Sequence, residues 1–144
     1  MKKIALGTDH AGFPLKEIIK EYLEARGFEI IDYGTHGNAP VDYPDYIRPA
    51  AQSVANGESD LGIVFGGSGN GEAMVANKIK GIRCGLCWNE ESARLTKEHN
   101  NANVIALGGR MVSEDEGIRI VDAWLNAEYQ GGRHQKRIDK MEMS

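Results

Sequence analysis

The chain has 144 residues, of which 41% are hydrophobic and 26% charged, as is usual for one globular domain. Its formal net charge of −4 at pH 7 argues against a general nucleic-acid-binding protein, because such domains are usually basic. No apolar stretch approaches the length of a membrane span and no signal-peptide pattern opens the chain, so we expect a cytoplasmic protein that binds neither nucleic acid nor membrane.

The chain begins with a short apolar segment, residues 3–8, and continues with an amphipathic one. Leucine, isoleucine and tyrosine repeat with helical spacing between Leu15 and Leu23. Pro14 suits the first turn of such a helix and Gly27 suits its C-terminal end. The first 27 residues therefore predict a strand followed by a helix.

The same alternation continues to the C-terminus. Further strands are predicted at 28–33, 61–65, 82–87 and 104–107. Helices are predicted at 44–55, from Asn89 to His99, from the capping box of Ser113 and Glu116, and after Gly132. Five strands that alternate with helices predict a single domain, residues 1–144, with a five-stranded parallel sheet between two layers of helices, a Rossmann-like three-layer α/β sandwich.

Cysteine and histidine give no sign of redox or metal chemistry. Cys84 and Cys87 lie inside a predicted strand, whereas a redox pair is expected at a strand-to-helix turn, so we interpret both as small buried apolar residues. One Cys-x-x-Cys also supplies too few ligands for structural zinc. The four histidines are scattered without ligand spacing: His10, His36, His99 and His134. We therefore predict no metal and no cofactor.

The segment Gly-Gly-Ser-Gly-Asn-Gly-Glu, residues 66–72, follows the third predicted strand. In open parallel sheets, ligands bind beyond the carboxyl ends of the strands. Glycines let backbone N–H groups converge on an anion, and the N-terminus of the next helix adds positive potential. A tight turn needs only one or two glycines, so four of them favour a loop that holds an anion or a developing oxyanion. The spacing is that of neither a dinucleotide-binding fingerprint nor a Walker A loop.

Other polar residues are weaker candidates when each is considered alone. Glu72 is an acid at the start of a predicted helix, which is a common surface feature. Only its place beside the glycine-rich loop makes it a candidate functional residue. Asp9 and His10 follow the first strand. They can be interpreted equally well as an acid/base pair or as a capping aspartate beside a structural histidine. The cations in 131–137 suit a phosphate, although such clusters are usually solvated helix faces. Residues 99–101 form another polar cluster.

Motifs along nearly the whole chain resemble the ribose-5-phosphate isomerase B family, which includes the galactose-6-phosphate isomerase subunits. The matching segments are 7–13, 42–44, 66–72 with 76–78, 81–83, 99–103, 108–110 and 131–137. The resemblance implies a Rossmann-like homodimer with sites between the subunits. It also implies a metal-free aldose–ketose isomerase that interconverts ribose 5-phosphate and ribulose 5-phosphate, with a base that moves a proton between C2 and C1 through a cis-enediolate.

One position departs from much of that family. Many members carry a cysteine base at the end of the third strand, where this chain has Gly66. Another branch carries a glutamate in the loop, in the pattern that this chain shares. The resemblance therefore implies that Glu72 is the base.

The resemblance also implies roles for the remaining site residues. Ser68 and the N–H groups of the loop would hold the enediolate oxygen, while His99 would open the furanose ring with help from Asp9. The loop residues in contact with substrate would be Gly67, Ser68, Gly69, Asn70 and Gly71. The other substrate-binding residues would be His10, Arg133 and Arg137 at the phosphate, with Asn100, Arg110 and His134.

Topology adds a prediction about the partner. A helix from Asn89 to His99 runs back to the amino edge of the sheet, so His99 is expected far from the loop 66–72 of its own chain. We therefore predict that His99 serves a partner's site, in an obligatory homodimer or a tetramer, and that the C-terminal helix from about residue 133 packs on that partner.

Two alternative functions stay open from the sequence. One is the same chemistry on a 6-phosphohexose, galactose 6-phosphate or allose 6-phosphate. The other is a non-catalytic phosphate- or nucleotide-binding module, which would leave Glu72, Asp9 and His99 without a role.

Overall fold

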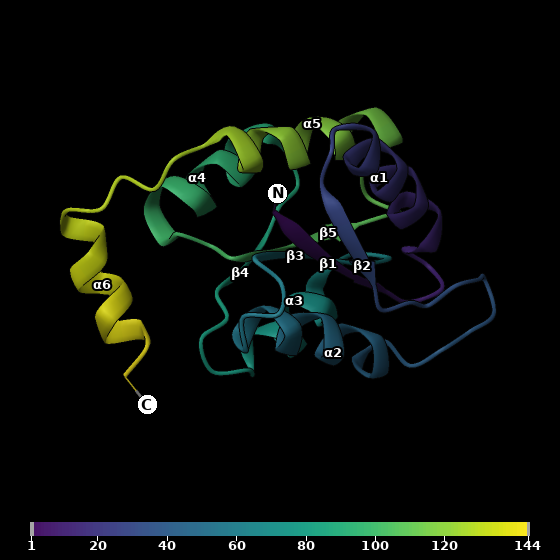
Figure 1. Ribbon diagram of the computed structural model, residues 1–144, viewed down its shortest axis with the longest axis horizontal. Helices are drawn as coiled ribbons and strands as arrows, with labels where there is room; N and C mark the ends of the chain where they lie inside the picture. The colour runs from purple at the N-terminus through teal and green to yellow at the C-terminus, as the bar shows by residue number, and fades with distance from the viewer. Residues whose placement is uncertain (1, 144) are drawn as a thin grey trace.

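The computed structural model describes residues 2–143, and strands and helices alternate along most of that length (Figure 1). The strands are β1 (Lys3–Thr8), β2 (Glu29–Asp32), β3 (Leu61–Gly66), β4 (Cys84–Leu86) and β5 (Val104–Gly108). The helices are α1 (Phe13–Ala25), α2 (Pro44–Ala55), α3 (Asn70–Asn77), α4 (Glu90–Asn100), α5 (Glu114–Asn126) and α6 (Arg133–Met141). None of the helices within residues 2–143 is long and apolar enough to cross a membrane.

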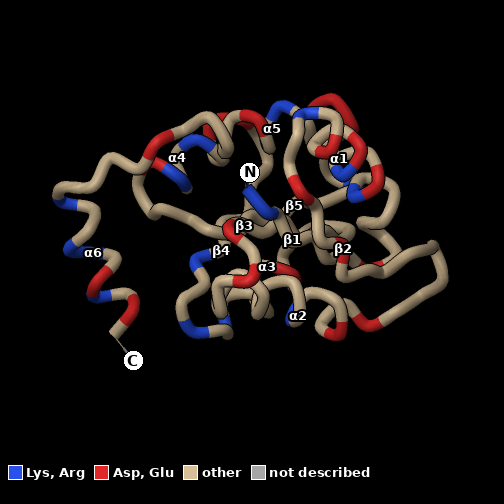
Figure 2. The backbone as a smooth tube through the Cα atoms, in the orientation of Figure 1, with Lys and Arg blue, Asp and Glu red and all other residues tan. Residues whose placement is uncertain are grey.

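Helix α6 lies at the periphery of the molecule, at the left of Figure 1, and an extended segment joins it to α5. Figure 2 shows lysine and arginine positions along its length. Its contacts with α4 place it beside that helix and away from the middle of the sheet.

All five strands pair in parallel, in the order β2-β1-β3-β5-β4. The chain passes from β1 outward to β2 and then returns across β1 to β3, so the direction of winding reverses between β1 and β3. Thr8 pairs with Phe65 at the ends of these two strands. The residues that follow, Asp9 after β1 and Gly66 at the last position of β3, therefore lie side by side at the carboxyl edge, at the kind of crevice where ligands bind in such folds.

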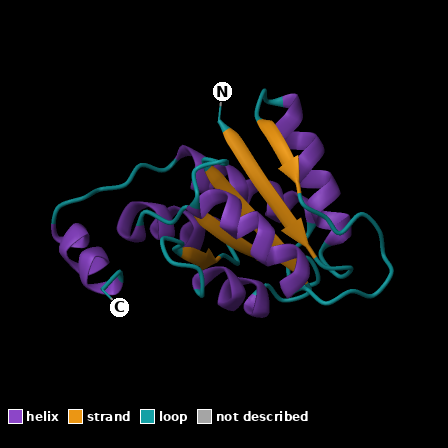
Figure 3. Ribbon diagram, turned by 60° about the horizontal axis from the view of Figure 1, so that its bottom comes forward, coloured by secondary structure: helices purple, strands orange, loops and turns teal. Residues whose placement is uncertain are grey.

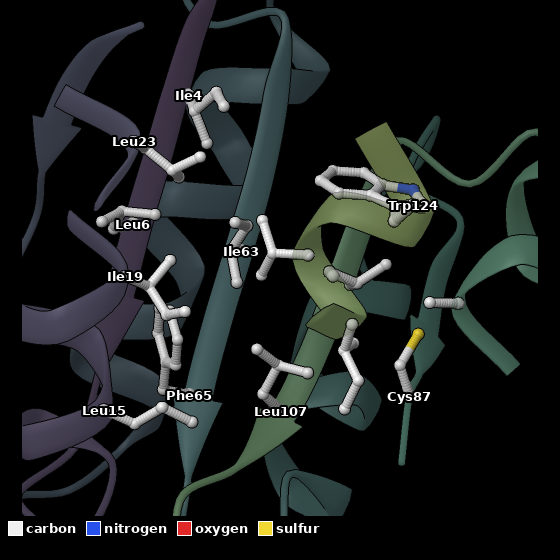
Figure 4. Close-up of a cluster of buried hydrophobic side chains, with 14 residues drawn as sticks. Ile4, Leu6, Leu15, Ile19, Leu23, Ile63, Phe65, Cys87, Leu107 and Trp124 are labelled. Carbon is white, nitrogen blue, oxygen red and sulfur yellow. The ribbon is translucent and has the colours of Figure 1, made fainter. Parts of the chain in front are cut away.

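Helices cover both faces of the sheet, α1, α4 and α5 on one and α2 and α3 on the other (Figures 1 and 3). Alternate strand residues serve the two faces, as the two-residue period of a strand requires. Ile4 and Leu6 of β1 pack with Trp124 of α5 in one core, which Figure 4 shows, while Ala5 packs against Ile47 of α2 in the other. The prediction of a three-layer α/β sandwich with a five-stranded parallel sheet is confirmed.

Two strands are shorter than predicted. The strand expected at 28–33 spans Glu29–Asp32, and the one expected at 82–87 spans only Cys84–Leu86. Before β4, the N–H of Arg83 donates to the side chain of Asn103 at 2.9 Å, while its carbonyl accepts from the N–H groups of Asn103 and Val104. Cys87 is buried and Cys84 half-buried, and both are free thiols. Burial raises the pKa of Cys87 to about 12 and that of Cys84 still further, in keeping with inert apolar residues.

The loop between β2 and α2 runs along the edge of the sheet that carries Asp9. Thr35, whose peptide bond with Gly34 is cis, donates its N–H to the carbonyl of Thr8 at 2.8 Å. The Lys16 ammonium, fully buried under this loop, donates to the Thr35 carbonyl at 3.1 Å and pairs with Asp32 at 2.6 Å. These contacts anchor the start of the loop next to the end of β1.

Candidate functional site

The carboxylate of Asp9 lies at the turn between β1 and α1. Its Oδ1 accepts a hydrogen bond from the N–H of Gly12 at 2.9 Å, and the residue is 8% exposed. The same turn is tied to β3, because the N–H of Asp9 donates to the Phe65 carbonyl. Asp9 thus stabilises the turn that leads into α1, and it lies at the carboxyl edge of the two central strands.

The glycine-rich loop is a short turn that passes directly into α3, which begins at Asn70. Gly69 has a left-handed backbone with φ of 89°, a conformation that glycine adopts without strain. The hydroxyl of Ser68 accepts a hydrogen bond from the N–H of Asn70 at 3.2 Å. The loop packs tightly on the end of β5, because a Cβ at Gly108 would meet the backbone of Ser68. Gly108 therefore makes room for this loop, and Gly109 makes room for the turn at Ala11 and Gly12.

The side chain of Glu72 turns back from α3 over the end of β3. A Cβ built on Gly66 would overlap the Glu72 carboxyl group, so this carboxyl fills the space that a side chain at position 66 would need. Glu72 is 4% exposed. Burial raises the pKa of its carboxyl, and the negative charge of Asp9 raises it further.

Three further side chains lie at the same edge of the sheet, at the end of β1 or against the glycine-rich loop. The Nδ1 of His10 accepts a hydrogen bond from the N–H of Val41 at 3.2 Å, which ties the loop before α2 to the end of β1. Arg110 donates its N–H to the carbonyl of Gly67, and its side chain lies beside that residue. The ring of Tyr43 covers Gly71 at the start of α3 and is 37% exposed.

Tyr43 was not among the predicted site residues, although it lies in the Asp-Tyr-Pro segment that matches the family. A tyrosine just before a helix has no distinctive pattern of its own. The match to the family was its one signal in the sequence. The structure adds that Gly71, which has no side chain, leaves room for the ring.

The other predicted site residues lie at the opposite edge of the sheet. The guanidinium of Arg83, just before β4, donates to the carbonyls of Asn100 and Asn101 at 2.9 Å each. These contacts place the end of α4 at the amino end of β4. Because the strands are parallel, this edge is opposite to the one that carries Gly66. Within one chain, His99 is therefore distant from the glycine-rich loop, as the topology predicted.

Helix α6 joins the end of α4 at that edge. The rings of His99 and His134 stack with centroids 4.4 Å apart and an interplanar angle of 16°. At the far end of α6, Arg83 forms an ion pair of 2.9 Å with Glu142. The cationic residues Arg133 and Arg137 thus belong to the same cluster as His99.

The predicted site residues therefore form two groups. The base group lies at the carboxyl edge and comprises Asp9, His10, Gly67, Ser68, Gly69, Asn70, Gly71, Glu72 and Arg110. The histidine group lies at the amino edge and comprises His99, Asn100, Arg133, His134 and Arg137. No single chain brings the two groups together.

The base group has the components of a proton-transfer site. A buried carboxyl group with a raised pKa is a base poised nearer to neutral pH than a free glutamate. It lies beside a hydroxyl and the N–H groups of a helix N-terminus, which can stabilise negative charge on a substrate oxygen. Among residues 2–143, no three or more His, Cys, Asp or Glu side chains are grouped to hold a metal ion.

Comparisons with known proteins agree on one family. The sequence model of the Ribose/Galactose Isomerase family matches residues 4–141. Ribose-5-phosphate isomerase B of Escherichia coli is 49% identical over 139 residues, which cover 96% of this chain and 93% of that protein. The structure of Clostridium thermocellum ribose-5-phosphate isomerase B has a TM-score of 0.96 at 51% identity and covers 97% of this chain and 95% of the other.

One similar structure contains a ligand. Ribose-5-phosphate isomerase B from Mycoplasma genitalium, solved with bound ribulose-5-phosphate, has a TM-score of 0.93 at 44% identity. The match covers 97% of this chain and 93% of that one.

Proposed function

Since this chain belongs to the ribose/galactose isomerase family, we propose that it interconverts D-ribose 5-phosphate and D-ribulose 5-phosphate. The observation that carries the proposal is the Glu72 carboxyl, buried over Gly66 and beside the glycine-rich loop. An aldose–ketose isomerase needs a base at C2 and donors for the enediolate oxygen, and these are the groups assembled there. The similar Mycoplasma genitalium enzyme, solved with ribulose-5-phosphate, supports the choice of a phosphorylated pentose.

Glu72 moves the proton in this mechanism. Its carboxylate takes the proton from C2 of the open-chain aldose, and the C1 carbonyl becomes the O1 oxyanion of a cis-enediolate. The proton of the 2-hydroxyl then passes to O1, so that C2 becomes the carbonyl carbon as Glu72 returns its proton to C1. The Ser68 hydroxyl and the N–H groups of Gly69, Asn70 and Gly71 hold the negative oxygen, and one such donor is typically worth about a hundredfold or more in rate. The raised pKa of Glu72 makes it a stronger base than a solvated glutamate.

A complete site is formed by two chains in this proposal. Substrate phosphate calls for cations, and Arg133 and Arg137 lie with His99 at the amino edge, away from Glu72 of the same chain. A two-fold homodimer in which α6 packs on the partner brings the histidine group of one chain to the base group of the other. His99 of the partner then opens the furanose ring with Asp9, while His10 and both arginines hold the phosphate.

Turnover of ribose 5-phosphate in the presence of EDTA tests the activity directly. The proposal predicts full activity in the chelator, because no step uses a metal. Absence of turnover would leave only a binding module, and loss of activity on chelation would replace the enediolate with a metal-dependent hydride shift. Conversion of galactose 6-phosphate or allose 6-phosphate, with ribose 5-phosphate inert, would contradict the pentose assignment.

A mixture of two inactive variants tests the shared site. Glu72→Gln damages the base group and His99→Ala damages the histidine group. In a mixed dimer, one of the two sites contains neither change, so mixing with subunit exchange should restore up to half of the activity per mixed dimer. Confirmed exchange without any recovery would show that each site comes from a single chain.

A further inference from the structure

His134 is built into the chain differently from the two arginines beside it. Arg133 and Arg137, four residues apart, are exposed on one face of α6, while His134 and Ile138, also four apart, are buried on another. The buried face is turned toward α4, because the His134 ring stacks on that of His99. The helix therefore presents cations to a ligand on one side and a ring to His99 on the other.

The surroundings of His134 do not suit a phosphate ligand. The residue is 8% exposed, and its Nε2 is buried with no hydrogen-bond partner within the described residues. Burial lowers the pKa of His134, and the nearby His99, Arg133 and Arg137 lower it further, so all of its surroundings disfavour a proton on the ring. A ring that stacks on another ring, with its buried nitrogen unpartnered within the described residues, acts through its shape.

The other end of α6 holds the stack in place. Arg83 pairs with Glu142 after the last turn of α6, and the same guanidinium donates to the carbonyls of Asn100 and Asn101 at the end of α4. One side chain thus fixes the end of α4 that carries His99 relative to the helix that carries His134. The stack at one end of α6 and the ion pair at the other set the orientation of the His99 ring.

We propose that His134 is a positioning residue, whose ring holds His99 in the orientation needed to open the furanose ring. The inference rests on the proposed function. In that step the C1–O4 bond breaks, O4 takes a proton from His99, and the 1-hydroxyl of the sugar gives its proton to the Asp9 carboxylate. His134 touches neither sugar nor phosphate and acts only through His99.

Comparing the reaction that starts from ribose 5-phosphate with the one that starts from ribulose 5-phosphate distinguishes a role in ring opening from a role in proton transfer or phosphate binding. Ribulose 5-phosphate is acyclic, because the 5-oxygen that would close a furanose onto C2 is esterified. Exchange of its C1 hydrogen with D₂O requires Glu72 and the loop but no ring opening. The experiment compares that exchange, followed by NMR, with turnover of ribose 5-phosphate, in His134→Ala, His134→Phe and wild-type dimers.

His134→Ala removes the stacked ring and should lower ribose 5-phosphate turnover about tenfold while C1 exchange stays within about twofold of wild type. His134→Phe keeps a ring in the stack and gives up only an unpartnered nitrogen, so its turnover should stay within about threefold. Gln135→Ala is the matched control on α6: its side chain is exposed and bonds Tyr129 and Asp139, and the change should leave both rates unaltered.

Several results would overturn the positioning role. Equal losses of exchange and turnover in His134→Ala, or no loss of either, would do so. A rise in the KM for ribulose 5-phosphate in both the alanine and phenylalanine variants would make His134 a phosphate ligand instead. If His134→Ala does not fold, His134→Phe decides alone. The phenylalanine ring should hold His99 as the histidine ring does, so loss of ribose 5-phosphate turnover in this variant, with C1 exchange intact, would contradict the proposal. Wild-type protein without turnover or exchange would refute the proposed function itself.

Discussion

Replacing Gly66 with alanine should separate catalysis from folding. The added methyl group would overlap the Glu72 carboxyl, which is the far end of a flexible side chain, so the side chain can rotate away while the backbone stays. Overpacking of this kind costs about 1–3 kcal/mol of stability. The displaced carboxyl can no longer reach C2, and loss of a general base lowers the rate by about 100-fold or more. We therefore expect a folded dimer with kcat reduced by at least that factor.

Turnover of ribose 5-phosphate and thermal unfolding, measured on the same preparation, check this prediction. Gly62→Ala is a matched control, because it adds the same methyl group in the interior of β3, against Val54 and Val104 and away from the site. Gly66→Ala with wild-type turnover would refute the placement of the Glu72 carboxyl or its role as base. A constructive test uses Gly66→Cys with Glu72→Ala, which places a thiol where the carboxyl lay. This double variant should be at least about tenfold more active than Glu72→Ala alone.

Two further predictions concern buried charge. The raised pKa of Glu72 means that the folded state holds its proton more tightly than the unfolded state, so this residue costs stability as pH rises above its ordinary value of 4.5. Glu72→Gln should therefore raise the free energy of unfolding at pH 7 and leave it nearly unchanged at pH 4; equal effects at both pH values would contradict the shift. Lys16→Met removes the fully buried partner of Asp32, and because Lys20 still contacts that carboxylate, the loss should be near the low end of the usual range, about 3 kcal/mol by denaturant unfolding. A loss below about 1 kcal/mol would show that Lys20 alone compensates the buried charge.

Local pattern was sufficient to predict the layers of this fold. Helical spacing between Leu15 and Leu23, a capping box at Ser113, and apolar strand segments each depend on neighbours in the chain, and all appear in the structure. The carboxyl-edge rule for parallel sheets then placed Asp9 and the loop 66–72 on one side. Strand ends were less predictable, because contacts between residues far apart in the chain, such as the one between the Arg83 N–H and the Asn103 side chain, leave no local pattern.

Contacts between distant segments were beyond the reach of sequence patterns. Nothing in the local sequence around residues 99 and 134 indicates that their rings stack. In the sequence, Arg83 has no feature that distinguishes it from a surface cation, whereas in the structure it contacts the ends of both α4 and α6. Gly66 is the instructive case. The sequence shows that a side chain is missing there, and only the packing shows that the Glu72 carboxyl occupies its space.

The central claim is that Glu72 carries the proton between C2 and C1, and solvent exchange in Glu72→Gln tests it most directly. The amide has nearly the shape of the carboxyl group but cannot accept the proton. We predict that this variant incorporates no deuterium from D₂O at C1 of ribulose 5-phosphate, while it binds that ligand with close to wild-type affinity in a calorimetric titration. Exchange at close to the wild-type rate in Glu72→Gln would contradict the account, because another group would then have to be the base.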